Sequence, residues 1–138
     1  MRTDENNNKI YGSPKLTGTT IQFNGHNNIL YFENDNISIE NSNIIFKGND
    51  SVVVVRRNSN TVKVGIIIYS ASAVYIGRDV WMTGKIELNA GEAKNIFIGD
   101  ECLISSQCSA RTTDSHMIYS IETLDRINEG RSIFIGDH

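Results

Sequence analysis

The chain has 138 residues, the length of one typical domain, and a formal net charge of −3. This weakly acidic balance lacks the excess of Lys and Arg that binds a phosphate backbone, so we expect no nucleic-acid partner. No apolar run approaches the roughly 18 residues that span a bilayer, and the polar N-terminus lacks the apolar segment of a signal peptide. We therefore expect a cytoplasmic protein without a membrane span.

Residue usage favours β-strands. Ile and Val together number 28, whereas Leu and Ala together number 10, and β-branched side chains prefer the pleated surface of a strand. Sixteen Asn and 11 Gly tolerate the left-handed backbone of tight corners. The composition thus predicts an all-β fold whose corners are made by Asn, Gly and Asp.

The first 14 residues form a polar, Asn-rich segment that we expect to be a frayed tail. From Ile21, apolar residues come in alternating pairs, the pattern of short strands with one face inward. These pairs are Ile21/Phe23, Ile29/Tyr31, Ile37/Ile39, Ile44/Phe46, Val52/Val54 and Val62/Val64. Turn residues separate them, and no gap is long enough for a crossover helix. We therefore predict that residues 15–138 form a parallel β-helix, in which each short strand stacks on the next turn of the chain.

After Val64 the apolar pattern becomes a six-residue repeat. Positions one and five of each complete hexad are apolar or small, which predicts that they point inward: Val64/Ile68, Ser70/Val74, Ile76/Val80, Met82/Ile86, Ile98/Cys102 and Ile104/Cys108. The pair Ile-Gly recurs at Ile76, Ile98 and Ile135, at intervals of 22 and 37 residues. If three hexads make one coil, the first interval contains four inserted residues around Ala90 and the second contains nineteen. The second insertion predicts a long loop over residues 113–132, which carries His116.

The two cysteines fit this repeat. Cys102 and Cys108 are six residues apart, which is the repeat length and not a usual metal or redox spacing. Both are predicted to be small buried residues, and no metal site is predicted. The order Asp114-Ser115-His116 is not expected to form a hydrolase triad, because adjacent residues rarely converge in that geometry.

Four segments carry a resemblance to a known family: Ile98-Gly-Asp-Glu-Cys102, Arg111-Thr-Thr-Asp-Ser-His116, Arg126-Ile-Asn128 and Ile133-Phe-Ile-Gly-Asp137. With the hexads, they resemble the hexapeptide-repeat acyltransferases, and more narrowly the bacterial O-acetyltransferases of capsule, exopolysaccharide or lipopolysaccharide sugars. The resemblance implies a left-handed parallel β-helix, assembled as a homotrimer with acetyl-CoA between neighbouring subunits. The handedness follows from the resemblance alone, because crossovers between parallel strands are generally right-handed.

The resemblance also implies a mechanism for acetyl transfer to a carbohydrate acceptor. His116 matches the loop histidine that removes a proton from a sugar hydroxyl, and imidazole titrates near neutral pH as this role requires. Transfer is direct, without an acyl-enzyme. Asp114 and Arg111 are expected to bind the acceptor or to orient the imidazole. No cofactor-binding residue is assigned; Arg56-Arg57 is interpreted as a solvated corner, with contact to a coenzyme A phosphate as the alternative.

In the family that the chain resembles, further coils follow the segment that matches Ile135-Gly-Asp-His138. The chain stops there, part-way through a hexad, so we expect an incomplete final coil with an open β edge. This leaves a second hypothesis, a catalytically inactive β-helix that serves as a binding or assembly module. A third, an amino-sugar or nucleotide-sugar N-acyltransferase of the same fold, lacks a recognisable nucleotide-sugar pocket.

Overall fold

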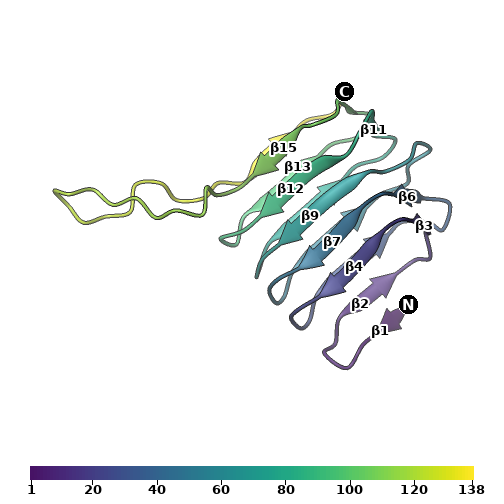
Figure 1. Cartoon of the computed structure of the whole chain (residues 1–138), viewed down its shortest axis with the longest axis horizontal. Coiled ribbons are helices and arrows are strands. Elements are labelled where there is room, and N and C mark those ends of the chain that lie inside the picture. Colours follow the sequence, from purple (N-terminus) through teal and green to yellow (C-terminus); the bar gives the residue numbers. More distant parts are fainter.

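The computed structural model describes residues 1–138 as a coil of short strands with a long projecting arm (Figure 1). The strands are β1 (Arg2–Thr3), β2 (Lys9–Tyr11), β3 (Lys15–Thr17), β4 (Thr20–Phe23), β5 (Ile29–Phe32), β6 (Ser38–Glu40), β7 (Asn43–Phe46), β8 (Val52–Val55), β9 (Val64–Ile68), β10 (Ala73–Ile76), β11 (Trp81–Met82), β12 (Ile86–Ala90), β13 (Asn95–Ile98), β14 (Leu103–Ile104), β15 (Ser109–Arg111) and β16 (Ile133–Ile135). The all-β prediction is confirmed. The structure contains no helix that could cross a membrane.

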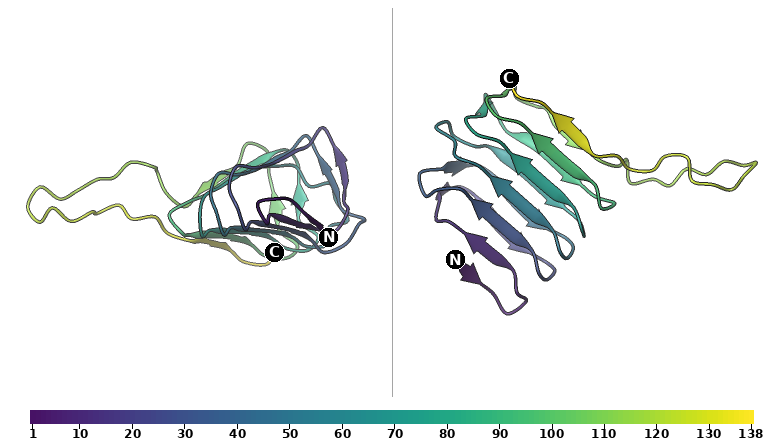
Figure 2. Two further views of the ribbon diagram at one scale, coloured as in Figure 1. Left: turned by 90° about the horizontal axis from the view of Figure 1, so that it is seen from below. Right: turned by 180° about the vertical axis from the view of Figure 1, so that it is seen from behind.

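The solenoid has three faces, which enclose its core. One is the sheet β1-β2-β5-β8-β10-β13-β16, and a second is the sheet β15-β12-β9-β7-β4. The third consists of the pairs β3-β6 and β11-β14, with a parallel bridge from Ile39 to Val62 on the far side of β6. The chain visits the three faces in turn, and every strand pair except β1–β2 is parallel. This is the predicted parallel β-helix, seen in two further directions in Figure 2.

The predicted coil spacing is confirmed by strand register. Ile76 lies opposite Ile98 in the pairing of β10 with β13, and Ile98 lies opposite Ile135 in the pairing of β13 with β16. The three Ile-Gly segments are therefore successive layers of one face, and the residues between Arg111 and Ile133 are an insertion into a single coil. Figure 2 shows this insertion, residues 112–132, as an arm that leaves the solenoid and returns to it.

Inward residues stack into columns between coils. Ile44, Ile66 and Leu88 are partners in register on β7, β9 and β12, and their exposed fractions are 0%, 0% and 3%. Apolar side chains buried in this way supply most of the stability of a solenoid, because each coil covers the next. The inward positions predicted between Val64 and Ile98 are buried, except that Ser70 is exposed and Ser72 is buried in its place.

The predicted inward face was wrong for two early strands. In β5 the buried residues are Leu30 and Phe32, not Ile29 and Tyr31. In β8 the buried residues are Val53 and Val55, not Val52 and Val54. Both strands are unbroken runs of four apolar residues, so polarity does not distinguish their two faces.

The expectation that residues 1–14 fray was also wrong. β2 pairs in parallel with β5 and thereby adds to the first face. Asn8 is buried, and its Oδ1 accepts hydrogen bonds from the backbone N–H of Asn28 (3.0 Å) and from the amide of Asn28 (2.9 Å). A buried amide is stable where its donors and acceptors are paired, so this polar segment is held by its side chains.

The two cysteines occupy different environments. Cys102 is buried, as predicted, and its Sγ lies 3.0 Å from the carbonyl oxygen of Gly136. Cys108 is exposed, contrary to the prediction. It lines a small apolar hollow of about 70 Å³ with Ile104 and Ile135, at a layer that no further coil of the described chain covers.

Candidate functional site

The arm is closed at its root by a buried threonine. Thr112 follows β15, and its Oγ1 accepts a hydrogen bond from the N–H of Gly91 (2.8 Å) and donates one to the carbonyl oxygen of Gly91 (2.9 Å). The carbonyl oxygen of Thr112 accepts a hydrogen bond from the N–H of Arg131 (2.8 Å), which joins the outgoing and returning segments of the arm. The root is therefore anchored to the coil before it.

A carboxylate of that coil ties down more of the arm. Oε1 of Glu92 accepts hydrogen bonds from the guanidinium of Arg126 and the hydroxyl of Thr113, both at 2.6 Å. Its Oε2 accepts one from the N–H of Gly130 at 2.9 Å. These donors, of which Arg126 has the largest effect, lower the pKa of Glu92 to about 2, because they favour the charged carboxylate. The four-residue insertion around Ala90 and the arm thus meet in one ion-paired contact.

Asn128 clamps the two segments of the arm around Asp114 and His116. Its amide nitrogen lies 3.0 Å from both carboxylate oxygens of Asp114 and also donates to the carbonyl oxygen of His116. Its Oδ1 accepts a hydrogen bond from the N–H of Ile118 at 2.7 Å. The hydrogen bond from Asn128, with that from the N–H of His116, lowers the pKa of Asp114, which is therefore ionised at neutral pH.

The clamp fixes the backbone of His116 and leaves its ring free. The N–H of His116 donates to Oδ1 of Asp114 at 3.2 Å, but the exposed imidazole makes no hydrogen bond within the chain. Asp114 therefore positions the peptide that carries the histidine and does not orient the ring directly. The free ring nitrogens can each contact a substrate group, which is the property that a proton-transfer residue needs.

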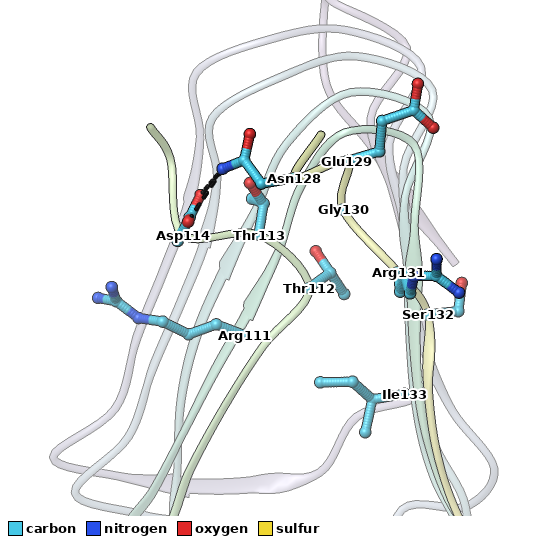
Figure 3. Close-up of a pocket in the computed structure, with 10 residues that line it drawn as sticks. All are labelled: Arg111, Thr112, Thr113, Asp114, Asn128, Glu129, Gly130, Arg131, Ser132 and Ile133. Carbon is cyan, nitrogen blue, oxygen red and sulfur yellow. Dashed lines mark hydrogen bonds between the residues drawn. The ribbon is translucent and has the colours of Figure 1, made fainter. Parts of the chain in front are cut away.

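A cavity of about 470 Å³ lies beside the clamp. Figure 3 shows its lining: Arg111, Thr112, Thr113, Asp114, Asn128, Glu129, Gly130, Arg131, Ser132 and Ile133. Of the three residues predicted from sequence, Asp114 and Arg111 line it and His116 does not. The guanidinium of Arg111 is exposed and has no partner within the chain.

Three important residues of this site had no predicted role. Asn128 and Arg126 lie in a segment that carried the family resemblance, but only the folded arm brings them to Asp114 and Glu92. Glu92 lies in the insertion around Ala90, and its separation of 34 residues from Arg126 gave no sign of an ion pair. The spacing of the two insertions, one coil apart, is the only signal that could have suggested this contact.

The Arg56-Arg57 corner has carboxylate partners. Arg56 and Arg78 both place a guanidinium nitrogen 2.8 Å from Oε1 of Glu33, and Arg57 pairs with Asp79 at 3.0 Å. These arginines lower the pKa of Glu33, so the cluster is ionised at neutral pH. Arg56 is therefore not an unpaired cation awaiting a phosphate. No group of three or more His, Cys, Asp or Glu side chains that could hold a metal ion is present.

Comparison with known proteins finds sequences and solved structures that are similar to this chain. No protein-family model matches the chain. A polysialic acid O-acetyltransferase of Neisseria meningitidis is 32% identical over 134 residues, which are 96% of this chain and 61% of that protein. A polysialic acid O-acetyltransferase of Escherichia coli O1:K1 / APEC is 32% identical over 86 residues, 62% of this chain and 27% of that protein. The chain thus spans less than two thirds of the length of either curated relative.

Two solved structures share the fold. The polySia-specific acetyltransferase NeuO superposes with a TM-score of 0.74 at 25% identity, over 93% of this chain and 64% of that one. The polysialic acid O-acetyltransferase OatWY superposes with a TM-score of 0.72 at 26% identity, over 93% of this chain and 66% of that one. Sequence and fold agree: the chain is similar to these polysialic acid O-acetyltransferases over most of its own length and shares the left-handed β-helix of the solved structures.

Proposed function

We propose that the protein is an acetyl-CoA-dependent O-acetyltransferase that modifies a hydroxyl of a carboxylated surface polysaccharide of the polysialic acid class. The observation that carries this proposal is the homology to polysialic acid O-acetyltransferases, which extends over 96% of the chain and so includes the arm. The unpaired guanidinium of Arg111 at the clamp cavity supports an acidic sugar, since arginine binds carboxylates with two parallel hydrogen bonds.

His116 is the general base of this proposal. Its imidazole removes the proton of the acceptor hydroxyl as the oxygen attacks the acetyl thioester, whose carbonyl carbon gains a C–O bond and loses its C–S bond. The imidazole then passes the proton to the departing thiolate. Because the acceptor oxygen attacks the thioester directly, no acyl-enzyme forms. The clamp of Asn128 and Asp114 supports this role because it fixes the His116 backbone and leaves both ring nitrogens accessible.

Acetyl-CoA is the acyl donor in this proposal, and it supplies the activated acetyl group. The described chain offers no residue that we assign to it, because the Arg56 corner is already paired with Glu33. We place the donor between neighbouring subunits because the resemblance implies that position. A cytoplasmic location, where acetyl-CoA is available, belongs to the same proposal.

A homotrimer completes the proposed enzyme. The arm carries exposed apolar side chains: Met117, Ile118, Tyr119, Ile121, Leu124 and Ile127. Ile121 is 95% exposed, and an apolar cluster of this kind is typical of a surface that meets another subunit. Its position on a projecting arm (Figure 1) supports contact with a neighbouring copy. Ile121→Asp should then lower the mass in solution from trimer to monomer.

The proposal is tested by incubating the chain with acetyl-CoA and polysialic acid. Release of free coenzyme A thiol and a gain of acetyl mass on the polymer are the expected results. His116→Ala should reduce the rate by a factor of about 10² to 10⁴, the usual contribution of a general base. His26→Ala is the matched control, because His26 is also exposed but lies in a turn at the other end of the solenoid. Its rate should equal that of the unmodified chain.

Two results would overturn the proposal. If His116→Ala transfers acetyl groups as fast as the unmodified chain, His116 is not the general base. Binding of polysialic acid by a trimer that transfers no acetyl group would favour the second hypothesis, a binding module without catalysis.

A further inference from the structure

A second cavity lies on the outside of the solenoid, next to the clamp cavity. It has a volume of about 350 Å³ and runs over the outer face of β9, β12 and β15. We call it the outer groove, and the residues used below are Gly65, Ile67, Glu87, Asn89, Ser109 and Arg111. Because residues alternate between the two sides of a strand, these six point outward while Ile66 and Leu88 between them are buried.

Strand register shows which side chains border Gly65 in the outer groove. Gly65 lies between Asn43 and Glu87 in one outward column, and it has no side chain to fill its place. A Cβ on Gly65 would lie only 1.8 Å from Oε2 of Glu87, so the carboxylate group of Glu87 occupies the space over the glycine. The absence of a side chain on Gly65 thus lets the Glu87 carboxylate lie against the backbone of β9, where it forms part of the lining of the groove.

The polar groups of the outer groove are free to bind a ligand. The side chains of Asn89, Ser109 and Arg111 make no hydrogen bond within the chain, and Glu87 makes only an exposed ion pair with Lys85 at 3.4 Å. An amide, a hydroxyl, a carboxylate and a guanidinium on one face can bind both the hydroxyl and the carboxylate groups of a sugar. The half-buried side chain of Ile67 adds an apolar surface among them.

The ring of Tyr69 lies next to the groove, on the side of the arm. Tyr69 follows Ile67 on the outward side and is 40% exposed. Its ring lies beside Gly91 and Thr113: a Cβ on Gly91 would be 3.4 Å from both side chains. Because Gly91 has no side chain, part of the ring remains open next to the root of the arm. An open tyrosine ring offers an apolar face for the C–H side of a pyranose and a hydroxyl for its polar edge.

Arg111 joins the two cavities, since it is the one residue that lines both of them. Each cavity falls in the range of about 300–1,000 Å³ that ligand clefts occupy. Two strand spacings, about 10 Å, separate β9 from β15, which gives the groove length along the solenoid axis. We propose that the outer groove binds the sugar residues next to the acetylated one in a polymeric, carboxylated acceptor, with Arg111 holding a carboxylate at the junction. This inference rests on the proposed function and adds to it the path of the polymer.

The experiment measures binding of polysialic acid and of free sialic acid by calorimetry without acetyl-CoA, so that catalysis is not required. Ser109→Glu adds a negative charge to the groove and should weaken binding of the polymer at least tenfold, because like charges brought together in a contact are strongly unfavourable. Glu87→Gln removes a negative charge and should strengthen binding several-fold. Tyr69→Ala should weaken binding of the polymer about tenfold, in line with the loss of one aromatic contact.

Matched controls separate the groove from general charge and folding effects. Thr20→Glu adds the same charge to the same outward column as Ser109, four strands away and outside the groove, and it should bind like the unmodified chain. Tyr31→Ala removes a tyrosine of nearly equal exposure, 39%, from the face formed by β5 and its neighbours and should also have no effect. Each variant should keep the far-ultraviolet spectrum of the unmodified chain, since all these side chains point outward.

The outcomes distinguish this inference from the proposed function. If the unmodified chain acetylates the polymer and Ser109→Glu binds and acetylates it equally well, the outer groove is not a subsite, while the transferase proposal stands. If Ser109→Glu and Thr20→Glu weaken binding equally, the effect is one of net charge and the inference is again overturned. If the unmodified chain neither binds nor acetylates the polymer, both proposals fail.

Discussion

Truncation of Ile66 to alanine tests whether this side chain points into the core of the solenoid. Ile66 is fully buried on the central strand β9, with Ile44 and Leu88 as partners in the coils on either side. The change removes three carbons, whose transfer from water contributes about 2.4 kcal/mol. Since both flanking coils hold their positions, a cavity remains, and measured losses for this type of change reach about 2–5 kcal/mol. We expect a loss of about 3–4 kcal/mol in the free energy of unfolding.

Urea unfolding followed by far-ultraviolet circular dichroism measures this loss. With a slope of about 2 kcal/mol per molar urea, the midpoint should fall by roughly 1.5–2 M. Ile45→Ala is the matched control, because Ile45 is the outward neighbour of Ile44 and is only half-buried. Its loss should stay below about 1.5 kcal/mol. A larger loss for Ile45 than for Ile66 would mean that the register is shifted by one residue, which exchanges the two faces of a strand and would refute the columns described above.

Three further predictions concern the arm. Thr112→Val removes the hydroxyl that serves both backbone groups of buried Gly91, and urea unfolding should report a loss of about 1–3 kcal/mol; no loss would mean that water replaces it. Asn128→Asp replaces the donor that faces Asp114 with an acidic acceptor, so the clamp should open and trypsin should cut the arm several-fold faster; an unchanged rate would count against the clamp. The folded pKa of Glu92 is depressed, so its contact with the arm contributes stability above about pH 4.5 and loses it as the pH falls toward 2. The amide shift of Gly130 in a nitrogen-15 NMR titration should therefore have its midpoint near 2, whereas a midpoint near 4.5 would contradict the ion pair.

The solenoid determines where the site can form. Glu92 holds the arm from the coil before it, so the contact requires two insertions at the same corner in successive coils. Because strands in successive coils are held in fixed register, residues that follow equivalent strand ends are adjacent in space. A regular frame of this kind lets an exposed loop carry chemistry while its root stays rigid.

Some failures of the sequence reasoning have a clear physical cause. Alternation of apolar and polar residues identifies the buried face only where the outward residues are polar. The run Ile29–Phe32 is apolar on both faces, so its inward residues are decided by stacking on neighbouring coils. Asn8 is the opposite case, since a polar residue became buried because Asn28 and the adjacent backbone satisfy its amide.

Three features could be predicted from the sequence alone: the all-β class, the parallel coil from the spacing of Ile76, Ile98 and Ile135, and the position of the histidine-bearing loop. These features depend on local periodicity and on insertion length, which can be read along the chain. The folded chain was needed to show that Glu92 and Asn128 anchor the arm, that the ring of His116 is free, and that the outer groove meets the clamp cavity at Arg111. Such contacts join residues from different coils or from opposite segments of the arm, and their partners are chosen by three-dimensional proximity, which no spacing in the sequence specifies.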